Sequence, residues 1–196
     1  MATIEVERWW GNTPAAQGSG RALLVLPGMN YPVDGAGIML PVRALAEQGW
    51  EVFAVAWDLA DVREDPQALR QAVEQAAEQA HQAAGGATTM MLLGKSVASL
   101  ATGWVARAAM PAIWLTPMLT RPEVCGALAA SPAPALLAGG SADQLWDGAA
   151  ARATGKQVLE LGAVDHGFIS PSGDPAYLAT MTRLTAACTD FAASLG

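Results

Sequence analysis

Three stretches of the sequence place a reactive side chain just after an apolar run. Ser96 follows the run at 90–93 within the pentapeptide GKSVA, Asp143 follows 135–138, and His166 follows 157–161. A serine hydroxyl is a weak nucleophile until a base within hydrogen-bond reach takes its proton. An imidazole suits that role because its pKa lies near neutrality, and a carboxylate can fix its tautomer. These three residue types could together carry out nucleophilic catalysis.

The elements that must position these residues alternate between short apolar strands and helices. A period-2 pattern at 3–10 predicts an edge strand, and continuous apolar runs predict parallel strands covered on both faces. The predicted parallel strands are 22–26, 50–57, 90–93, 112–116, 135–138 and 157–161. The predicted helices are 38–48, 66–84, one that starts after Ser96, 122–130, one within 141–153, and 176–195. This alternation predicts an α/β fold with a doubly wound, mostly parallel sheet.

Functional residues of such sheets lie on loops at the carboxyl ends of the strands. Ser96, Asp143 and His166 all meet this condition. The only other histidine, His81, lies in the helix predicted at 66–84, away from its apolar face. We therefore interpret His81 as a solvated helix residue.

Three other acidic residues compete with Asp143. Asp165 adjoins His166, and sequence neighbours rarely face each other across a loop. Asp147 lies a turn further into the following helix. Asp58 ends the strand at 50–57, so Asp58 could be the acid only if the acid had moved from the strand at 135–138 to that strand. Asp143 is therefore the preferred acid.

The stretch around Ser96 has other interpretations. Serine is a favoured N-cap, so Ser96 alone could simply begin a helix, but the matching Asp143 and His166 loops favour a nucleophile. A phosphate loop would need glycine where Thr89 stands. A Ser–Lys pair is disfavoured because Lys95 adjoins Ser96 and should point to the other side of the turn. We expect Lys95 to be partly exposed and paired with a carboxylate.

The chain order Ser, Asp, His on strand-end loops resembles the α/β-hydrolase superfamily, and in particular its small, capless bacterial members. The resemblance covers residues 22–195. It departs from the family's G-x-S-x-G elbow at Ala98, where the residue must be small and alanine is the next smallest choice. It also departs at Pro27-Gly28, where the family has His-Gly.

The resemblance implies a role for each residue. Ser96 would be the nucleophile, His166 the general base and then acid, and Asp143 the residue that orients His166. An oxyanion hole would be formed by the backbone N–H groups of Met29 and Val97, with a helix that begins at Val97 adding its dipole. The implied fold is a minimal α/β-hydrolase without a cap domain.

The predicted substrate site is open and apolar. No insertion between 112–116 and the helix near 122 is long enough for a cap. Apolar side chains on the strand-end loops could form an acyl or small-alcohol pocket. The candidate substrate-binding residues are Tyr31, Trp57, Met118, Trp146 and Phe168. Two histidines in different roles and two isolated cysteines do not form a metal site, so neither metal nor cofactor is expected.

Length, composition and net charge limit the number of domains and the kinds of partner that the protein could have. A chain of 196 residues suits one domain, 1–196, and 52% hydrophobic content excludes disorder. A net charge of −7 argues against nucleic acid or an anionic membrane as partner. No membrane span or export signal is visible, and Cys125 and Cys188 read as free thiols, so a cytoplasmic protein is expected. The apolar stripe of the last helix would dock on the sheet or, as the alternative, on a second subunit in a homodimer.

We therefore predict a serine hydrolase, and specifically a carboxylic-ester hydrolase that forms an acyl-Ser96 intermediate on a small or medium apolar ester. The partner would be a small ester-like molecule. Thioester or amide hydrolysis would use the same residues, and non-hydrolytic chemistry on them stays open. A binding or scaffold protein that kept the fold and lost turnover is the alternative of another class.

Overall fold

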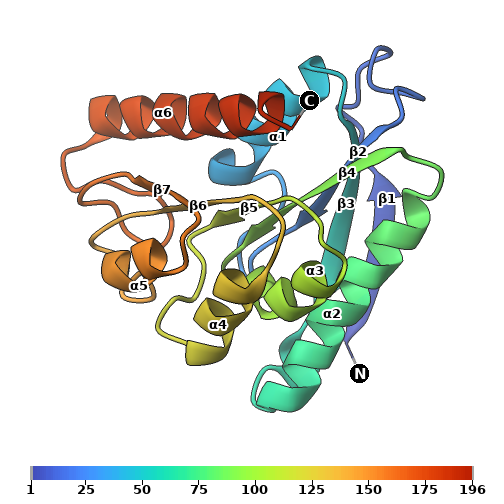
Figure 1. Ribbon diagram of the computed structural model, residues 1–196. Helices are drawn as coiled ribbons and strands as arrows, with labels where there is room; N and C mark the ends of the chain where they lie inside the picture. The colour runs from blue at the N-terminus through green and yellow to red at the C-terminus, as the bar shows by residue number, and fades with distance from the viewer. Residues whose placement is uncertain (1, 196) are drawn as a thin grey trace.

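The computed structural model describes residues 2–195, which form a seven-stranded sheet between two layers of helices (Figure 1). The strands are β1 (Thr3–Arg8), β2 (Arg21–Leu26), β3 (Glu51–Asp58), β4 (Thr89–Lys95), β5 (Ala112–Leu115), β6 (Ala135–Gly139) and β7 (Gln157–Glu160). The α-helices are α1 (Ala36–Glu47), α2 (Pro66–Ala83), α3 (Thr102–Arg107), α4 (Pro122–Ala130), α5 (Gly148–Ala153) and α6 (Asp174–Ala193). Two 3₁₀ helices are η1 (Ala60–Val62) and η2 (Ser96–Ala101).

The strands follow the order β1-β3-β2-β4-β5-β6-β7 across the sheet. β1 pairs antiparallel with β3, and the other neighbouring pairs are parallel. The predicted doubly wound, mostly parallel sheet is confirmed, and so is the predicted edge strand at its start.

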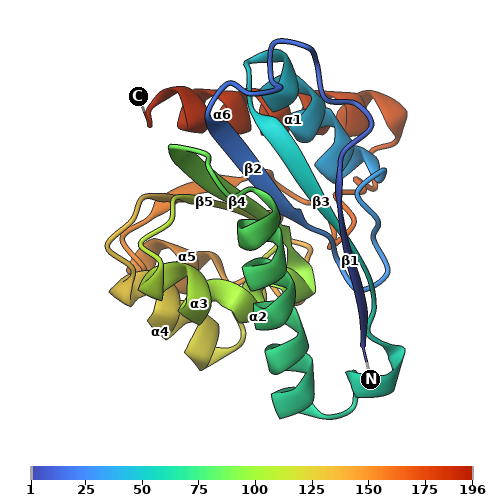
Figure 2. The same cartoon turned by 90° about the vertical axis from the view of Figure 1, so that its right-hand side faces the viewer.

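The helices cover both faces of the sheet. Helices α1 and α6 lie on one face and α2 to α5 on the other (Figures 1 and 2). Alternate residues of one strand enter different cores: Leu23 and Val25 of β2 pack on the α1 side, whereas Leu24 and Leu26 pack on the α2 side. Both faces are buried, which explains why the parallel strands are continuous apolar runs.

The last helix packs as its stripe predicts. Met181, Leu184, Cys188 and Phe191 are buried in the core on the α1 side of the sheet, and α6 contacts α1. Both cysteines are free, and burial raises the pKa of the Cys188 thiol to about 12. Within residues 2–195, no helix combines the length and apolarity that crossing a bilayer requires.

Two local differences from the sequence expectations affect the site. Strand β4 extends to Lys95, so Ser96 follows the strand directly. The segment after Ser96 is the 3₁₀ helix η2, and a regular α-helix begins only at Thr102. The predicted helix that starts at Val97 is therefore wrong in type over its first residues.

Candidate active site

Ser96 lies at a sharp turn between a strand and a helix. Its φ is +55°, a conformation that L-residues adopt at a cost of about 1–3 kcal/mol. The residues around the turn must be small: a Cβ at Gly94 would lie 2.8 Å from the Trp114 ring and 3.0 Å from Cβ of Ala98. Ala98 therefore fits the close approach that the elbow requires, because Gly94 opposite it has no side chain.

The structure brings Ser96, His166 and Asp143 together in one hydrogen-bonded chain. Nε2 of His166 lies 2.7 Å from Oγ of Ser96, and Nδ1 of His166 lies 2.8 Å from Oδ2 of Asp143. The other carboxylate oxygen of Asp143 accepts a bond from the backbone N–H of Leu145 at 2.8 Å. The Asp143 side chain is 1% exposed and that of His166 is 37% exposed, so the acid is sealed while the imidazole stays open to solvent.

The competing acids have other partners. Asp147 caps α5 by accepting from the N–H groups of Ala149 and Ala150. Asp165 accepts from two N–H groups of its own loop, and Asp58 accepts from the N–H of Ala60. His81 is half-buried, and its ring lies 5.8 Å from that of Trp104. Among these four acids, only Asp143 is hydrogen-bonded to the imidazole of His166.

Ser99, which the sequence did not single out, braces the turn. Its buried hydroxyl donates to the backbone oxygen of Ser96 at 2.7 Å and accepts from the N–H of Met118 at 3.1 Å. These two bonds join the elbow to the loop after β5. The spacing of three residues is that of a local side-chain to backbone bond, which is the only signal in the sequence that could have indicated it.

Lys95 differs most from its predicted environment. The expectation of a partly exposed lysine paired with a carboxylate is wrong, because Lys95 is 1% exposed. Its Nζ donates to Oγ1 of Thr116 at 2.8 Å and to the backbone oxygen of His166 at 2.7 Å. The ammonium also lies 4.6 Å from the ring centre of Tyr31 and 5.2 Å from that of Phe168. Lys95 thus ties the end of β4 to the end of β5 and to the histidine loop.

Burial changes the acidity of Lys95. Loss of hydration lowers the pKa of its ammonium from 10.5 to about 8, and attraction to Asp143 and Asp165 opposes that shift. Thr116 and Phe168, which surround the ammonium, have positive φ values of +43° and +65°. Such backbone conformations depend on tertiary packing, so the sequence carried no signal for them.

The two N–H groups predicted for an oxyanion hole are free of backbone acceptors. The N–H of Met29 makes no backbone hydrogen bond within the described residues. Val97 is the second residue of η2, and the first N–H groups of a helix have no acceptor inside it. Their role as oxyanion donors stays a prediction.

The predicted substrate-binding residues divide into two groups. Tyr31, Trp57 and Met118 are half-buried and keep some surface. Phe168 is fully buried beside Lys95, and Trp146 is 8% exposed, with its Nε1 donating to Glu160 at 3.2 Å. Both rings are therefore buried in the core of this structure, and a contact of either ring with substrate stays a prediction.

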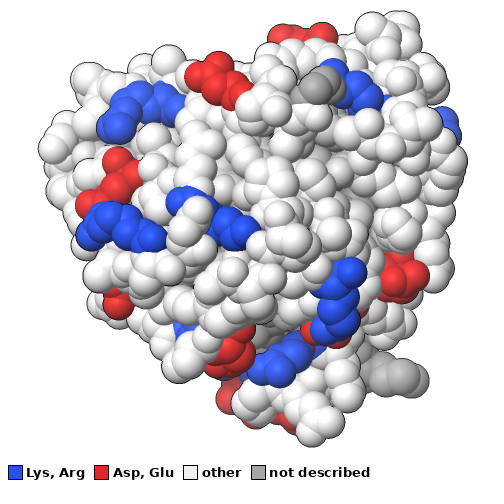
Figure 3. All heavy atoms as spheres, in the orientation of Figure 1, with Lys and Arg blue, Asp and Glu red and all other residues white. Residues whose placement is uncertain are grey.

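Charges elsewhere on the surface are scattered. On the face shown in Figure 3, basic and acidic side chains are interspersed, some of them in contact, with uncharged surface between these groups. Within residues 2–195, no three or more His, Cys, Asp or Glu side chains are grouped so that they could hold a metal ion.

Several solved structures share this architecture, although their sequences differ widely from this one. No family model and no curated protein matches the sequence. Est1E from Butyrivibrio proteoclasticus, solved with ferulic acid bound, matches with a TM-score of 0.71 at 11% identity over 98% of this chain and 96% of its own. An α/β serine hydrolase without a lid from Xanthomonas campestris matches with a TM-score of 0.59 at 15% identity over 99% and 89%.

A third similar structure is a dienelactone hydrolase-like promiscuous phosphotriesterase from metagenomic libraries. It matches with a TM-score of 0.61 at 17% identity over 97% of this chain and 98% of its own. At such low identities these likenesses establish the fold. The chain has the α/β-hydrolase fold in a small form without a cap, and the predicted resemblance to small serine hydrolases is confirmed at that level.

Proposed function

We propose that this protein is a serine hydrolase that cleaves carboxylic esters through an acyl-Ser96 intermediate. The observation that carries the proposal is the continuous hydrogen-bonded chain from Ser96 through His166 to Asp143, with distances of 2.7 and 2.8 Å. Such a chain activates a hydroxyl, because the imidazole can take the proton while the carboxylate holds its tautomer.

Acylation follows from this geometry. Nε2 of His166 takes the proton of Ser96 as Oγ attacks the ester carbonyl carbon. The carbonyl oxygen becomes negatively charged and accepts bonds from the N–H groups of Met29 and Val97, each worth about 2.7–4 kcal/mol. His166 then gives its proton to the departing alcohol, and the acyl group stays on Ser96.

Deacylation repeats these steps with water. His166 takes a proton from a water molecule, which attacks the acyl carbon, and Ser96 leaves with the proton that His166 returns. The exposed fraction of His166, 37%, provides the solvent access that this step requires. The absence of a cap in the fold leaves the same edge open to substrate.

The names of the similar structures are consistent with ester chemistry. Est1E was solved with an aromatic carboxylic acid bound, and the metagenomic protein is named a phosphotriesterase. Thioesters and amides would react through the same residues, so leaving-group preference is part of the test.

The test uses nitrophenyl acetate, butyrate and octanoate with wild type, Ser96→Ala and His166→Ala. We expect hydrolysis by wild type and a loss of about 10⁴-fold or more in kcat for both variants. Ser172→Ala, at an exposed serine, is the matched control and should match wild type. A folded wild type that cleaves no ester, thioester or amide would favour a scaffold protein, and full activity in Ser96→Ala would exclude the proposed nucleophile.

A further inference from the structure

A groove runs along the edge of the sheet beside the loop that carries Met29. It encloses about 320 Å³ between strands β1 and β3 and residues 27–34, and we call it the edge groove. Its floor includes Ala54 and Ala56 of β3, whose small side chains leave the space open. In the β1–β3 register, Glu7 lies opposite Ala54, so β1 forms one wall and the 27–34 loop forms the other.

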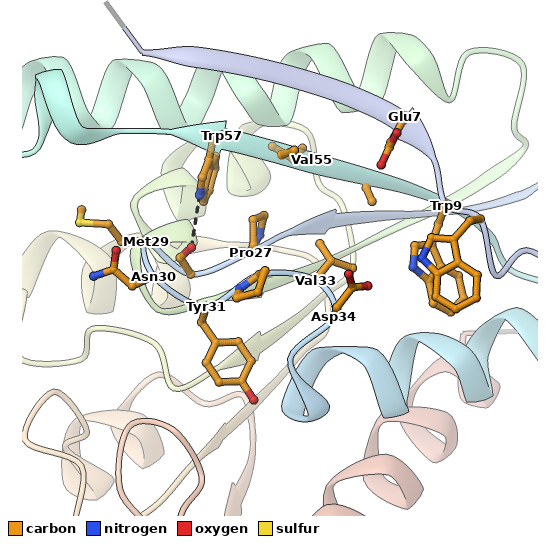
Figure 4. Close-up of a pocket in the computed structure, with 15 residues that line it drawn as sticks. Glu7, Trp9, Pro27, Met29, Asn30, Tyr31, Val33, Asp34, Val55 and Trp57 are labelled. Carbon is orange, nitrogen blue, oxygen red and sulfur yellow. Dashed lines mark hydrogen bonds between the residues drawn. The ribbon is translucent and has the colours of Figure 1, made fainter.

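The edge groove shares the 27–34 loop with the proposed catalytic site. Met29, whose N–H is one of the proposed oxyanion donors, lines the groove near Trp57. The Nε1 of Trp57 donates to the backbone oxygen of Gly28 at 3.3 Å, which fixes this end of the groove against the same loop (Figure 4). A substrate with its carbonyl at Met29 could therefore extend one of its parts into the groove.

The far end of the groove combines aromatic rings with carboxylates. Trp9 and Trp10 close it, with ring centres 5.3 Å apart, and Trp10 is 77% exposed. Glu7 from β1 and Asp34 from the loop before α1 lie on opposite walls and point into the space between them (Figure 4). Neither carboxylate has an ion-pair or side-chain hydrogen-bond partner among residues 2–195, and the groove lining contains no Lys or Arg.

Trp9 contributes its aromatic ring to this end of the groove. It is 4% exposed, and its Nε1 has no hydrogen-bond partner within the described chain. That N–H is shielded from solvent and can only donate, so the part of Trp9 that a cation could contact is the face of its ring. Indole rings also attract cations at their faces, and carboxylates complement the same charge.

We propose that the edge groove binds the positively charged part of the substrate, an apolar chain or ring that ends in an ammonium or guanidinium group. This inference rests on the proposed hydrolase function and adds the substrate class to it. The apolar floor would hold the chain, and Glu7, Asp34 and the two indoles would hold the cation. Ala54 and Trp57 are three steps apart along β3, which sets the charge roughly 10 Å from the oxyanion end.

The test compares nitrophenyl esters of one chain length and different charge: ω-aminooctanoyl (cationic), octanoyl (neutral) and the suberate monoester (anionic). For wild type we expect kcat/KM for the cationic ester to exceed that for the neutral one by about tenfold and the anionic ester to be poorest. In Glu7→Gln/Asp34→Asn the ratio of cationic to neutral ester should fall to about one.

The control variant is Glu64→Gln/Asp190→Asn, which removes two exposed carboxylates outside the groove and changes the net charge equally. It should keep the wild-type ratio. Equal rates for the cationic and neutral esters in wild type, or the same loss of selectivity in the control, would overturn the proposal.

A binding measurement separates this inference from the proposed function. Ser96→Ala is titrated with octylammonium, octanol and octanoate while tryptophan fluorescence is recorded. We expect saturable binding of octylammonium that is tighter than that of octanol and is weakened in the background of Glu7→Gln/Asp34→Asn. If no ester is hydrolysed but octylammonium still binds, the proposed hydrolase function is refuted and the cation site remains supported. If octylammonium, octanol and octanoate bind equally, the cation site itself is refuted.

Discussion

The two regions on either side of the 27–34 loop differ in how their polar groups are satisfied. In the catalytic corner, formed by Lys95, Ser96, Thr116, Asp143 and His166, each side chain has a hydrogen-bond partner within 2.9 Å. In the edge groove, the exposed carboxylates of Glu7 and Asp34 have none within residues 2–195. Side chains that are already fixed by hydrogen bonds suit catalysis, because the reacting groups must be in position before substrate binds. Polar groups without a partner in the chain suit recognition, because a ligand can supply that partner.

The largest effect on kcat should come from a change of Asp143, the carboxylate of the catalytic corner. Asp143→Asn would keep the shape but let the amide favour the wrong tautomer of His166, so we expect kcat to fall by about 10⁴-fold. Steady-state kinetics with nitrophenyl butyrate measure it. Asp147→Asn is the matched control: it changes the N-cap of α5, where asparagine caps as well as aspartate, and should leave kcat unchanged. Equal losses in both variants would mean that Asp143 acts through the fold alone.

The next effect should come from Lys95. Lys95→Met would leave Thr116 and the His166 carbonyl without their donor, which lets the histidine loop shift. A displacement of about 1 Å in a catalytic group can cost about 10²-fold, so we expect a loss in kcat of that order with little change in KM. Wild-type kcat in a folded Lys95→Met protein would show that the corner does not depend on this lysine.

Lys95 should also make stability depend on pH. Its folded pKa of about 8 lies below the 10.5 of an ordinary lysine, so between these values the unfolded chain binds more protons. The free energy of unfolding should therefore rise with pH across this window, by at most about 3 kcal/mol, relative to Lys95→Met. Urea unfolding of both proteins between pH 7 and pH 11 measures the difference. A constant difference would contradict a charged, buried Lys95.

The smallest effect should come from a change in the edge groove, at Trp10. Trp10 is 77% exposed, so Trp10→Ala should change the free energy of unfolding by about 0.5 kcal/mol or less. It should still lower the preference for the cationic over the neutral octanoyl ester, by a few-fold, because one ring face is lost. A large loss of stability with unchanged preference would make Trp10 part of the fold and not of the groove.

Much of the fold could be predicted because it depends on local patterns. The apolar runs that became β2, β4 and β6 mark strands buried on both faces, and the stripe of α6 marks the side that packs. The loops after β4, β6 and β7 fall at one edge of a parallel sheet, which is why the sequence predicts that Ser96, Asp143 and His166 are neighbours.

The environment of Lys95 could not be predicted because it depends on distant parts of the chain. Its partners, Thr116 and the His166 carbonyl, lie 21 and 71 residues away. Phe168 turned out to be core because its positive φ accompanies an inward ring, a conformation that its residue type does not favour. The edge groove depends on the β1–β3 register and on two alanines opposite a loop, and such gaps follow from packing and not from periodicity.

The central claim, that Ser96 becomes acylated, can be measured directly. The protein is mixed with nitrophenyl butyrate, quenched in acid within the first turnover, digested, and its peptides are analysed by mass spectrometry. We predict a butyryl group on the peptide that contains Ser96 in wild type, with greater accumulation when Asp143→Asn slows deacylation, and none in Ser96→Ala. A butyryl group on another residue, or turnover by wild type with no adduct in either wild type or Asp143→Asn, would contradict the claim.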